Sequence, residues 1–198
     1  MLKIRGLLPP HQQLSIEELV QQMRFYFPHE VFPPVYGIRD LLLAEFILKS
    51  HGLVAEEMNP LYYNFESTEE IPLPKEYASP TQKYYIEKME LVRAVDFESY
   101  EKFEASLVKD LHKCPLACSV KLYPSFNDIT GKQLYDPTVN EVRQQGLHSM
   151  LLVARGRNEK AKHFLEFQDS YGTDVGDDGF VRVRMGNDLN THYVRFTL

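Results

Sequence analysis

The first half of the chain repeats apolar residues at the spacing of an α-helix. Three segments show this spacing, at residues 14–24, 38–51 and 99–111. Ser15 and Ser99 stand where a side chain can cap the start of a helix. The residues expected to face the core are Ile16, Leu19, Val20 and Met23 in the first segment, Ile38, Leu41, Leu42, Phe46 and Leu48 in the second, and Tyr100, Phe103, Leu107, Val108 and Leu111 in the third. The pattern therefore predicts three amphipathic helices.

After Pro115 the pattern changes to the alternation of apolar and polar residues that is typical of a β-strand. The first such strand is expected at 116–122. Further strands are expected near 91–95 and at 147–154, 163–168, 180–184 and 193–196, with glycines in the intervening turns. Because the helices come early and the strands late, we predict an α+β fold.

Composition and charge exclude some classes of binding partner. The chain is 43% hydrophobic and 25% charged, as in a globular protein. No apolar run approaches the roughly 20 residues that span a bilayer, so we expect no membrane partner. The net charge of −6 leaves no excess of lysine and arginine to neutralise phosphates, so we expect no nucleic-acid partner either.

The sequence also predicts a reducing compartment. Pro9 and Pro10 end the first apolar stretch before the core of a signal peptide can form. Cys114 and Cys118 are the only cysteines. In an extended segment their Cα atoms would lie roughly 13 Å apart, beyond the reach of a disulfide. We therefore expect the cytoplasm or another reducing compartment.

Candidate chemistry begins at His148, which opens the apolar strand G-L-H-S-M-L-L-V. Alone, such a histidine is more often structural than catalytic. Further along, residues 169–180 read D-S-Y-G-T-D-V-G-D-D-G-F. This segment resembles N-S-W-G-T-x-W-G-E-x-G-Y of the papain-like cysteine peptidases, in which the catalytic histidine begins the preceding strand. The residues identical in position are Ser170, Gly172, Thr173, Gly176 and Gly179.

The resemblance implies roles for two residues. His148 falls on the catalytic histidine, and Asp169 falls where the family has the asparagine that orients it. Weaker similarities extend toward the N-terminus: residues 14–20 resemble the family's L-S-x-Q-x-L-V, residues 44–53 its A-F-x-Y-I-x-x-N-G-G-I, and residues 115–120 its P-V-S-V-A-I. The similarity thus covers nearly the whole chain.

The fold implied by this resemblance is papain-like, with an abbreviated helical lobe and a β-rich, barrel-like lobe. We expect the helical lobe at 1–65, a proline-rich connection at 66–80 and the β-rich lobe at 81–198. His148 and Asp169 would line one side of a cleft between the lobes. We expect no cofactor and no metal, because the spacings H-x-x-x-H and C-x-x-C are absent. Two weaker metal alternatives are a site at His148, His163 and Asp169 and a calcium site in the acidic turn at 174–179.

The departures from the family concern the nucleophile. Family members carry Q-G-x-C-G-S-C-W ahead of the L-S-x-Q segment, which supplies the nucleophilic cysteine and a glutamine for the oxyanion. The residues before Leu14 contain no cysteine. Cys118 is expected to be a buried strand residue, and Cys114 to end a helix, where the dipole disfavours a thiolate. Ser149 follows His148 directly and should point to the opposite face of the strand.

Three functions are compatible with these features. We expect a catalytically silent homologue that binds a peptide or protein, with His148 and Asp169 as a vestigial base and its orienter and with no nucleophile. The alternative is a fragment or isoform of an active cysteine-type peptidase whose nucleophile helix is missing from this chain. A third is a hydrolase that uses Ser149 or Ser170. A partner chain would cover the face that the missing helix leaves.

Overall fold

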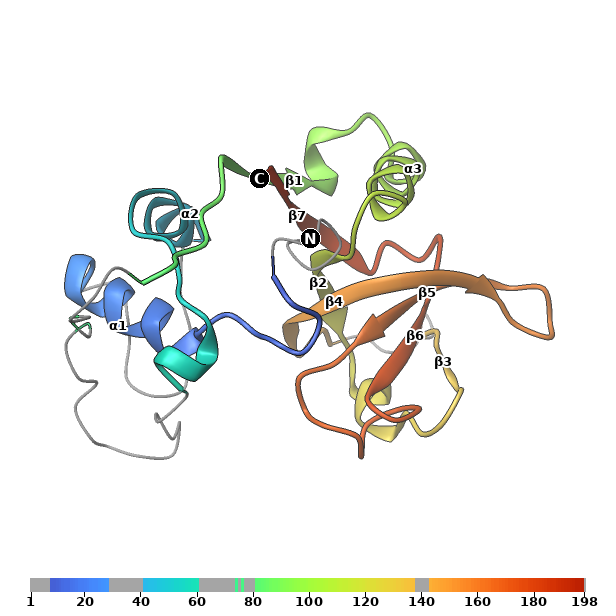
Figure 1. Ribbon diagram of the computed structural model, residues 1–198. Helices are drawn as coiled ribbons and strands as arrows, with labels where there is room; N and C mark the ends of the chain where they lie inside the picture. The colour runs from blue at the N-terminus through green and yellow to red at the C-terminus, as the bar shows by residue number, and fades with distance from the viewer. Residues whose placement is uncertain are drawn as a thin grey trace. The chain divides into compact units, whose positions relative to one another are not determined.

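The computed structural model describes residues 8–28, 41–60, 74, 76, 81–137 and 143–197. The chain forms two compact units, one of Met1–Met89 with Phe196–Leu198 and one of Glu90–Arg195. Helices come early and strands late in the chain (Figure 1), which confirms the predicted α+β class. Of the predicted connection at 66–80, only Pro74 and Glu76 are among the described residues.

Three α-helices and seven strands lie in the described part of the chain. The helices are α1 (Ile16–Tyr26), α2 (Leu41–Ser50) and α3 (Tyr100–Leu111), and the strands are β1 (Lys88–Arg93), β2 (Leu116–Leu122), β3 (Leu134–Tyr135), β4 (Gly146–Arg157), β5 (His163–Gln168), β6 (Phe180–Arg184) and β7 (Asn190–Thr197). Short 3-10 helices occupy Glu56–Met58, Ala94–Asp96 and Pro124–Asp128. No helix among these residues combines the length and apolar character that crossing a membrane requires.

Helix α1 begins as predicted but buries a face that differs in part from the predicted one. The Ser15 side chain caps it by accepting a hydrogen bond from the backbone N–H of Glu18 at 2.9 Å. Ile16, predicted to face the core, is 56% exposed, whereas the buried residues include Glu17 and Glu18. Glu18 is buried because its carboxylate accepts hydrogen bonds from the Val54 N–H, at 2.8 Å, and from the Lys83 and Gln22 side chains. Of the predicted core-facing residues Met23 is buried and Leu19 and Val20 are half-buried, so the apolar periodicity predicted the helix correctly and its buried face only in part.

In helix α2, too, the buried residues differ from those that the sequence predicted. Its described residues begin at Leu41, and the predicted start at Ile38 lies outside the described residues. Ala44 and Ile47 are buried, while Leu42 and Phe46, predicted to face the core, are 53% and 44% exposed. The first unit therefore exposes apolar side chains on both of its helices.

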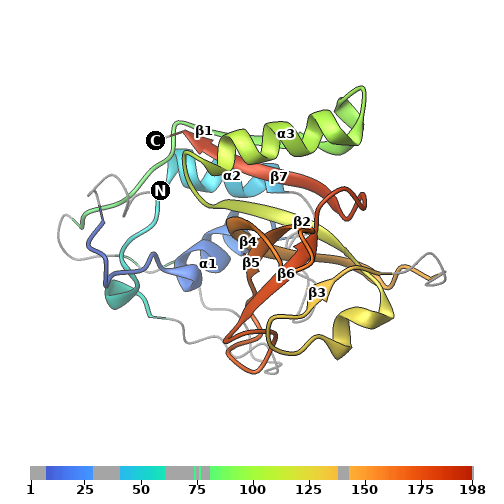
Figure 2. The same ribbon diagram turned by 90° about the vertical axis from the view of Figure 1, so that its right-hand side faces the viewer.

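Helix α3 packs through the residues that the sequence predicted. Phe103, Leu107 and Val108 are buried, and Figure 2 shows α3 lying along β7. Its Asp110 accepts hydrogen bonds from Tyr193, at 2.9 Å, and Arg195, at 3.1 Å, both on β7. Although burial raises the pKa of Asp110, the hydrogen bonds from Lys113, Tyr193 and Arg195 together hold it below its usual value.

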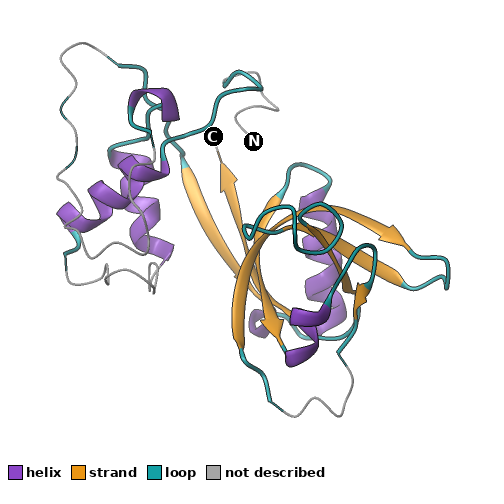
Figure 3. Cartoon of the chain, turned by 90° about the horizontal axis from the view of Figure 1, so that it is seen from below, coloured by secondary structure: helices purple, strands orange, loops and turns teal. Residues whose placement is uncertain are grey.

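The strands form one sheet in the order β1-β7-β2-β4-β5-β6-β3. Figure 3 shows that the strands of the second unit curve, as the predicted barrel-like lobe requires. Strand β4 is central, since it pairs antiparallel with both β2 and β5, and Val120 of β2 lies opposite His148. Strand β4 extends to Arg157, beyond the predicted 147–154, and the two-residue strand β3 was not predicted. The core contains the fully buried Leu152, Leu165, Phe167, Val181 and Val183.

The turn between β5 and β6 is shaped by glycines. Gly176 has a φ of 61°, and a Cβ built there would lie 2.2 Å from the carbonyl oxygen of Phe180. Gly172 has a φ of 86°, but a Cβ there would meet no atom within 4 Å. Gly176 is therefore required for its missing side chain as well as for its backbone conformation, as is Gly179, where φ is 86° and a Cβ would lie 2.9 Å from the Gly172 carbonyl oxygen.

We predict that Gly176→Ala destabilises the protein by more than about 3 kcal/mol, because it adds a backbone clash to the strain of a left-handed conformation. Gly172→Ala is the matched control and should cost only the strain, about 1–2 kcal/mol. Urea unfolding of both variants measures the difference. Equal losses would contradict the close approach at Gly176.

Candidate functional site

His148 lies near the start of β4, on the face of the strand that also carries Met150 and Leu152. The latter two are buried, so this face belongs to the core side of the sheet. The imidazole lies at the edge of that core, with 12% of its side chain exposed. The ring of Phe126 approaches it edge-on, with the ring centroids 6.0 Å apart. The position leaves the imidazole shielded but still accessible.

Asp169 follows β5 directly and brings a carboxylate to this histidine. Its Oδ1 lies 2.8 Å from Nε2 of His148, and its side chain is wholly buried. An ionised carboxylate only accepts hydrogen bonds, so Nε2 carries the proton and donates it. In the neutral imidazole Nδ1 is then the free acceptor, which is the arrangement of a general base held by an orienting group. The structure thus brings together the two residues that the resemblance assigned to the site.

The turn that follows Asp169 also donates hydrogen bonds to this carboxylate. Oδ1 also accepts the backbone N–H groups of Ser170, at 2.6 Å, and Tyr171, at 3.3 Å. The Tyr171 ring stacks on the imidazole with a centroid separation of 4.9 Å and an interplanar angle of 4°. Tyr171 therefore covers one face of His148 while its own side chain is largely in solvent.

The second carboxylate oxygen of Asp169 is buried without a hydrogen-bond partner among the described residues. If an asparagine stood here, its Oδ1 could accept the same three hydrogen bonds, and its NH₂ group would take the position of the unpartnered oxygen. The site therefore accommodates either residue, although a buried oxygen with no partner carries a desolvation cost.

Both cysteines of the chain lie in the second unit, and both are buried. Cys118 is on β2 opposite Met150, is 2% exposed, and its Sγ lies 3.6 Å from the carbonyl oxygen of Leu116. Burial raises the pKa of the Cys118 thiol well above its usual value, which keeps it protonated at neutral pH. Cys114, beyond the end of α3, is also buried.

Ser149 and His163 lie away from the imidazole, whereas Ser170 follows Asp169 directly and its backbone N–H bonds the same Oδ1 as His148. Ser149 lies opposite Ser119 of β2 and alternates with His148 along β4, so the two side chains leave opposite faces. His163, at the far end of β5 from Asp169, has its Nε2 3.1 Å from Arg157. Among the described residues, no group of three His, Cys, Asp or Glu side chains is arranged to hold a metal ion.

We predict that Asp169→Ala destabilises the protein by about 2–3 kcal/mol, since it leaves three N–H donors without their acceptor. Asp169→Asn keeps an acceptor oxygen in place and should change the stability by no more than about 1 kcal/mol. Urea unfolding of the two variants against wild type tests this. If both substitutions cost the same, the hydrogen bonds to Oδ1 do not stabilise the turn.

The fold is shared with solved structures of cysteine proteases. Bromelain from Ananas comosus, in complex with the inhibitor E64, matches over 98% of this chain and 80% of its own, with 18% identity and a TM-score of 0.66. The Carica candamarcensis cysteine protease CMS1MS2, in complex with E-64, matches over 98% and 82%, with 17% identity and a TM-score of 0.67. The digestive procathepsin L 3 of Tenebrio molitor matches over 100% of this chain but 58% of its own, with 17% identity and a TM-score of 0.69. At these identities the likeness shows the fold.

The family follows from the sequence of the greater part of the chain. No curated protein matches it. The sequence model described as "Papain family cysteine protease" matches residues 42–195, which include both His148 and Asp169. This chain therefore belongs to the papain family of cysteine proteases.

Proposed function

We propose that this chain is a catalytically silent member of the papain family that acts by binding a peptide or protein. The proposal is based on the burial of the cysteines: the sequence has only two, and both are buried. His148 thus has the orienting group that a catalytic histidine needs, but no sulfur nucleophile of this chain is available to it.

The chemistry of the family explains why this loss is decisive. Hydrolysis by a cysteine peptidase requires a thiolate beside the imidazole and hydrogen-bond donors for the tetrahedral oxyanion. Nδ1 of His148 can accept a proton, but an imidazole without a thiol beside it has no nucleophile to activate. The Q-G-x-C-G-S-C-W motif, which supplies both the thiol and the oxyanion glutamine in the family, is absent from these 198 residues. Binding of a peptide requires neither group.

A second candidate is that the chain is a fragment or isoform of an active cysteine-type peptidase, with the nucleophile helix supplied from outside these residues. The 2.8 Å hydrogen bond between His148 and Asp169 favours it, because a site released from catalysis has no need to keep this geometry. The exposed apolar side chains Phe25, Leu42 and Phe46 of the first unit also favour a partner chain that covers them. An in-frame Q-G-x-C-G-S-C-W in the transcript upstream of Met1 would favour this candidate over the first.

We predict that the purified chain hydrolyses a fluorogenic peptide no faster than buffer does. Removing one member of a serine-protease triad leaves only about 10³–10⁴-fold catalysis over water, and that remainder depends on the oxyanion hole and on substrate binding. His148→Ala should therefore leave the measured rate unchanged, as should His163→Ala at the far end of β5. A rate well above buffer that is lost in His148→Ala and kept in His163→Ala would show a working hydrolase.

A further inference from the structure

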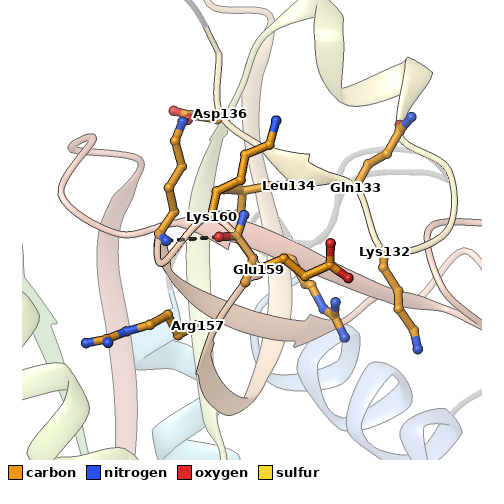
Figure 4. A pocket seen from close by; sticks show the side chains of 10 residues that line it. Lys132, Gln133, Leu134, Asp136, Arg157, Glu159 and Lys160 are labelled. Atoms are coloured by element: carbon orange, nitrogen blue, oxygen red, sulfur yellow. Dashed lines mark hydrogen bonds and ion pairs between the residues drawn. The ribbon is translucent and has the colours of Figure 1, made fainter.

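The second unit contains a hollow far from His148, at the other end of β4. It has a volume of 680 Å³ and is lined by the hairpin between β4 and β5, by the residues leading into and forming β3, and by Arg182 of β6. His148 and Arg157 are nine positions apart on β4, which corresponds to roughly 30 Å of strand. Figure 4 shows Lys132 and Gln133 on one side of this hollow and Arg157 and Lys160 on the other. The hollow is therefore separate from the candidate site.

The charge of the hollow is opposite to that of the chain. Its lining contains five cationic side chains and two carboxylates, whereas the whole chain carries a net charge of −6. The five are Lys132, Arg157, Lys160, Lys162 and Arg182, and the two are Asp136 and Glu159. Such a local excess of positive charge attracts anions.

Most of the hydrogen-bond acceptors in the hollow are already engaged. Asp136 accepts from Lys162 at 2.7 Å through one oxygen and from Asn187 through the other. Gln133 accepts the Thr130 N–H at 3.1 Å through its side-chain oxygen. Asn158 likewise accepts the Lys162 N–H at 2.9 Å. These bonds leave the NH₂ groups of the two amides as donors that a ligand can use.

Three cations remain to meet such a ligand. Lys160 forms no hydrogen bond or ion pair with any described residue. Arg157 is paired with the imidazole of His163, at 3.1 Å, which leaves its charge uncompensated. Lys132 forms a long ion pair with Asp177, at 4.0 Å, and since 71% and 41% of these side chains are exposed their attraction is weak. Of the two carboxylates in the lining, only Glu159 lacks a bound donor among the described residues.

We propose that this hollow binds a small polyanion that carries two or more phosphate groups. Lysine and arginine head groups and amide NH₂ groups are the donors that phosphate oxygens accept, and the volume is within the range of about 300–1,000 Å³ that small-molecule sites occupy. Because Lys132 and the pair Arg157 and Lys160 come from facing segments, a ligand with charge at both ends contacts both sides. The site is independent of the proposed function at His148.

Isothermal titration of the full chain with inorganic tripolyphosphate tests the proposal. We expect saturable binding at one site at an ionic strength of about 0.15 M. Lys160→Glu should weaken the binding about tenfold or more, since it replaces a charge-assisted donor by a repelling carboxylate. The matched control is Lys109→Glu on the exposed surface of α3, which makes the same change of charge outside the hollow and should leave the affinity within about twofold.

Three outcomes would overturn the assignment. The first is the absence of saturable binding by tripolyphosphate at millimolar concentration. The second is an equal weakening in Lys160→Glu and Lys109→Glu, which would reveal unspecific attraction to net charge. The third is binding of a polysulfated sugar or of a polyglutamate peptide while tripolyphosphate does not bind, which would assign the hollow to a different anion. The unfolding midpoints of both variants should lie near that of wild type, which ensures that a loss of binding is not caused by a loss of folding.

Discussion

The buried carboxylate of Asp169 joins strand β4 to the turn that follows β5. A single oxygen accepts hydrogen bonds from the His148 imidazole and from the backbone N–H groups of Ser170 and Tyr171. The same oxygen therefore fixes the ring of the histidine and the start of the turn, and the turn in turn places Tyr171 on the ring. Because a buried carboxylate is stable only when hydrogen-bonded, side chain and turn hold each other in place. This mutual dependence preserves the geometry of the pair in a chain whose thiols are buried away from solvent.

The residues of this pair could be found from the sequence because the information is local. The strand after Gly146 and the glycine-spaced turn at 169–180 are both short motifs, and the antiparallel pairing of β4 with β5 brings their ends together. The packing of Phe126 against His148 could not be found in this way. Phe126 lies in a short 3-10 helix with no periodic pattern, and its contact depends on how distant segments pack. No residue type at that position signals it.

The helices show a different limit of prediction. Apolar spacing identified α1 and its buried Met23. The side chains of Glu17, Glu18, Gln21 and Gln22 are buried as well, because they bond to one another and to groups from distant segments. A periodicity argument counts such side chains as solvated. Strand β3 was missed because two residues are too few to show an alternation. By contrast, α3 buries Phe103, Leu107 and Val108 of the apolar face that was predicted, and its buried Glu104 and Asp110 are hydrogen-bonded beside them.

We propose that no thiol of this chain serves His148 as a nucleophile. Intact-mass spectrometry of the folded chain after incubation with E-64, an epoxysuccinyl inhibitor that is bound in the bromelain and Carica structures, measures this directly. We expect an unchanged mass, because the Cys118 thiol is buried and protonated and Cys114 is buried as well. A stoichiometric adduct that maps to either cysteine and disappears in His148→Ala would contradict it, since the imidazole would then be activating that sulfur.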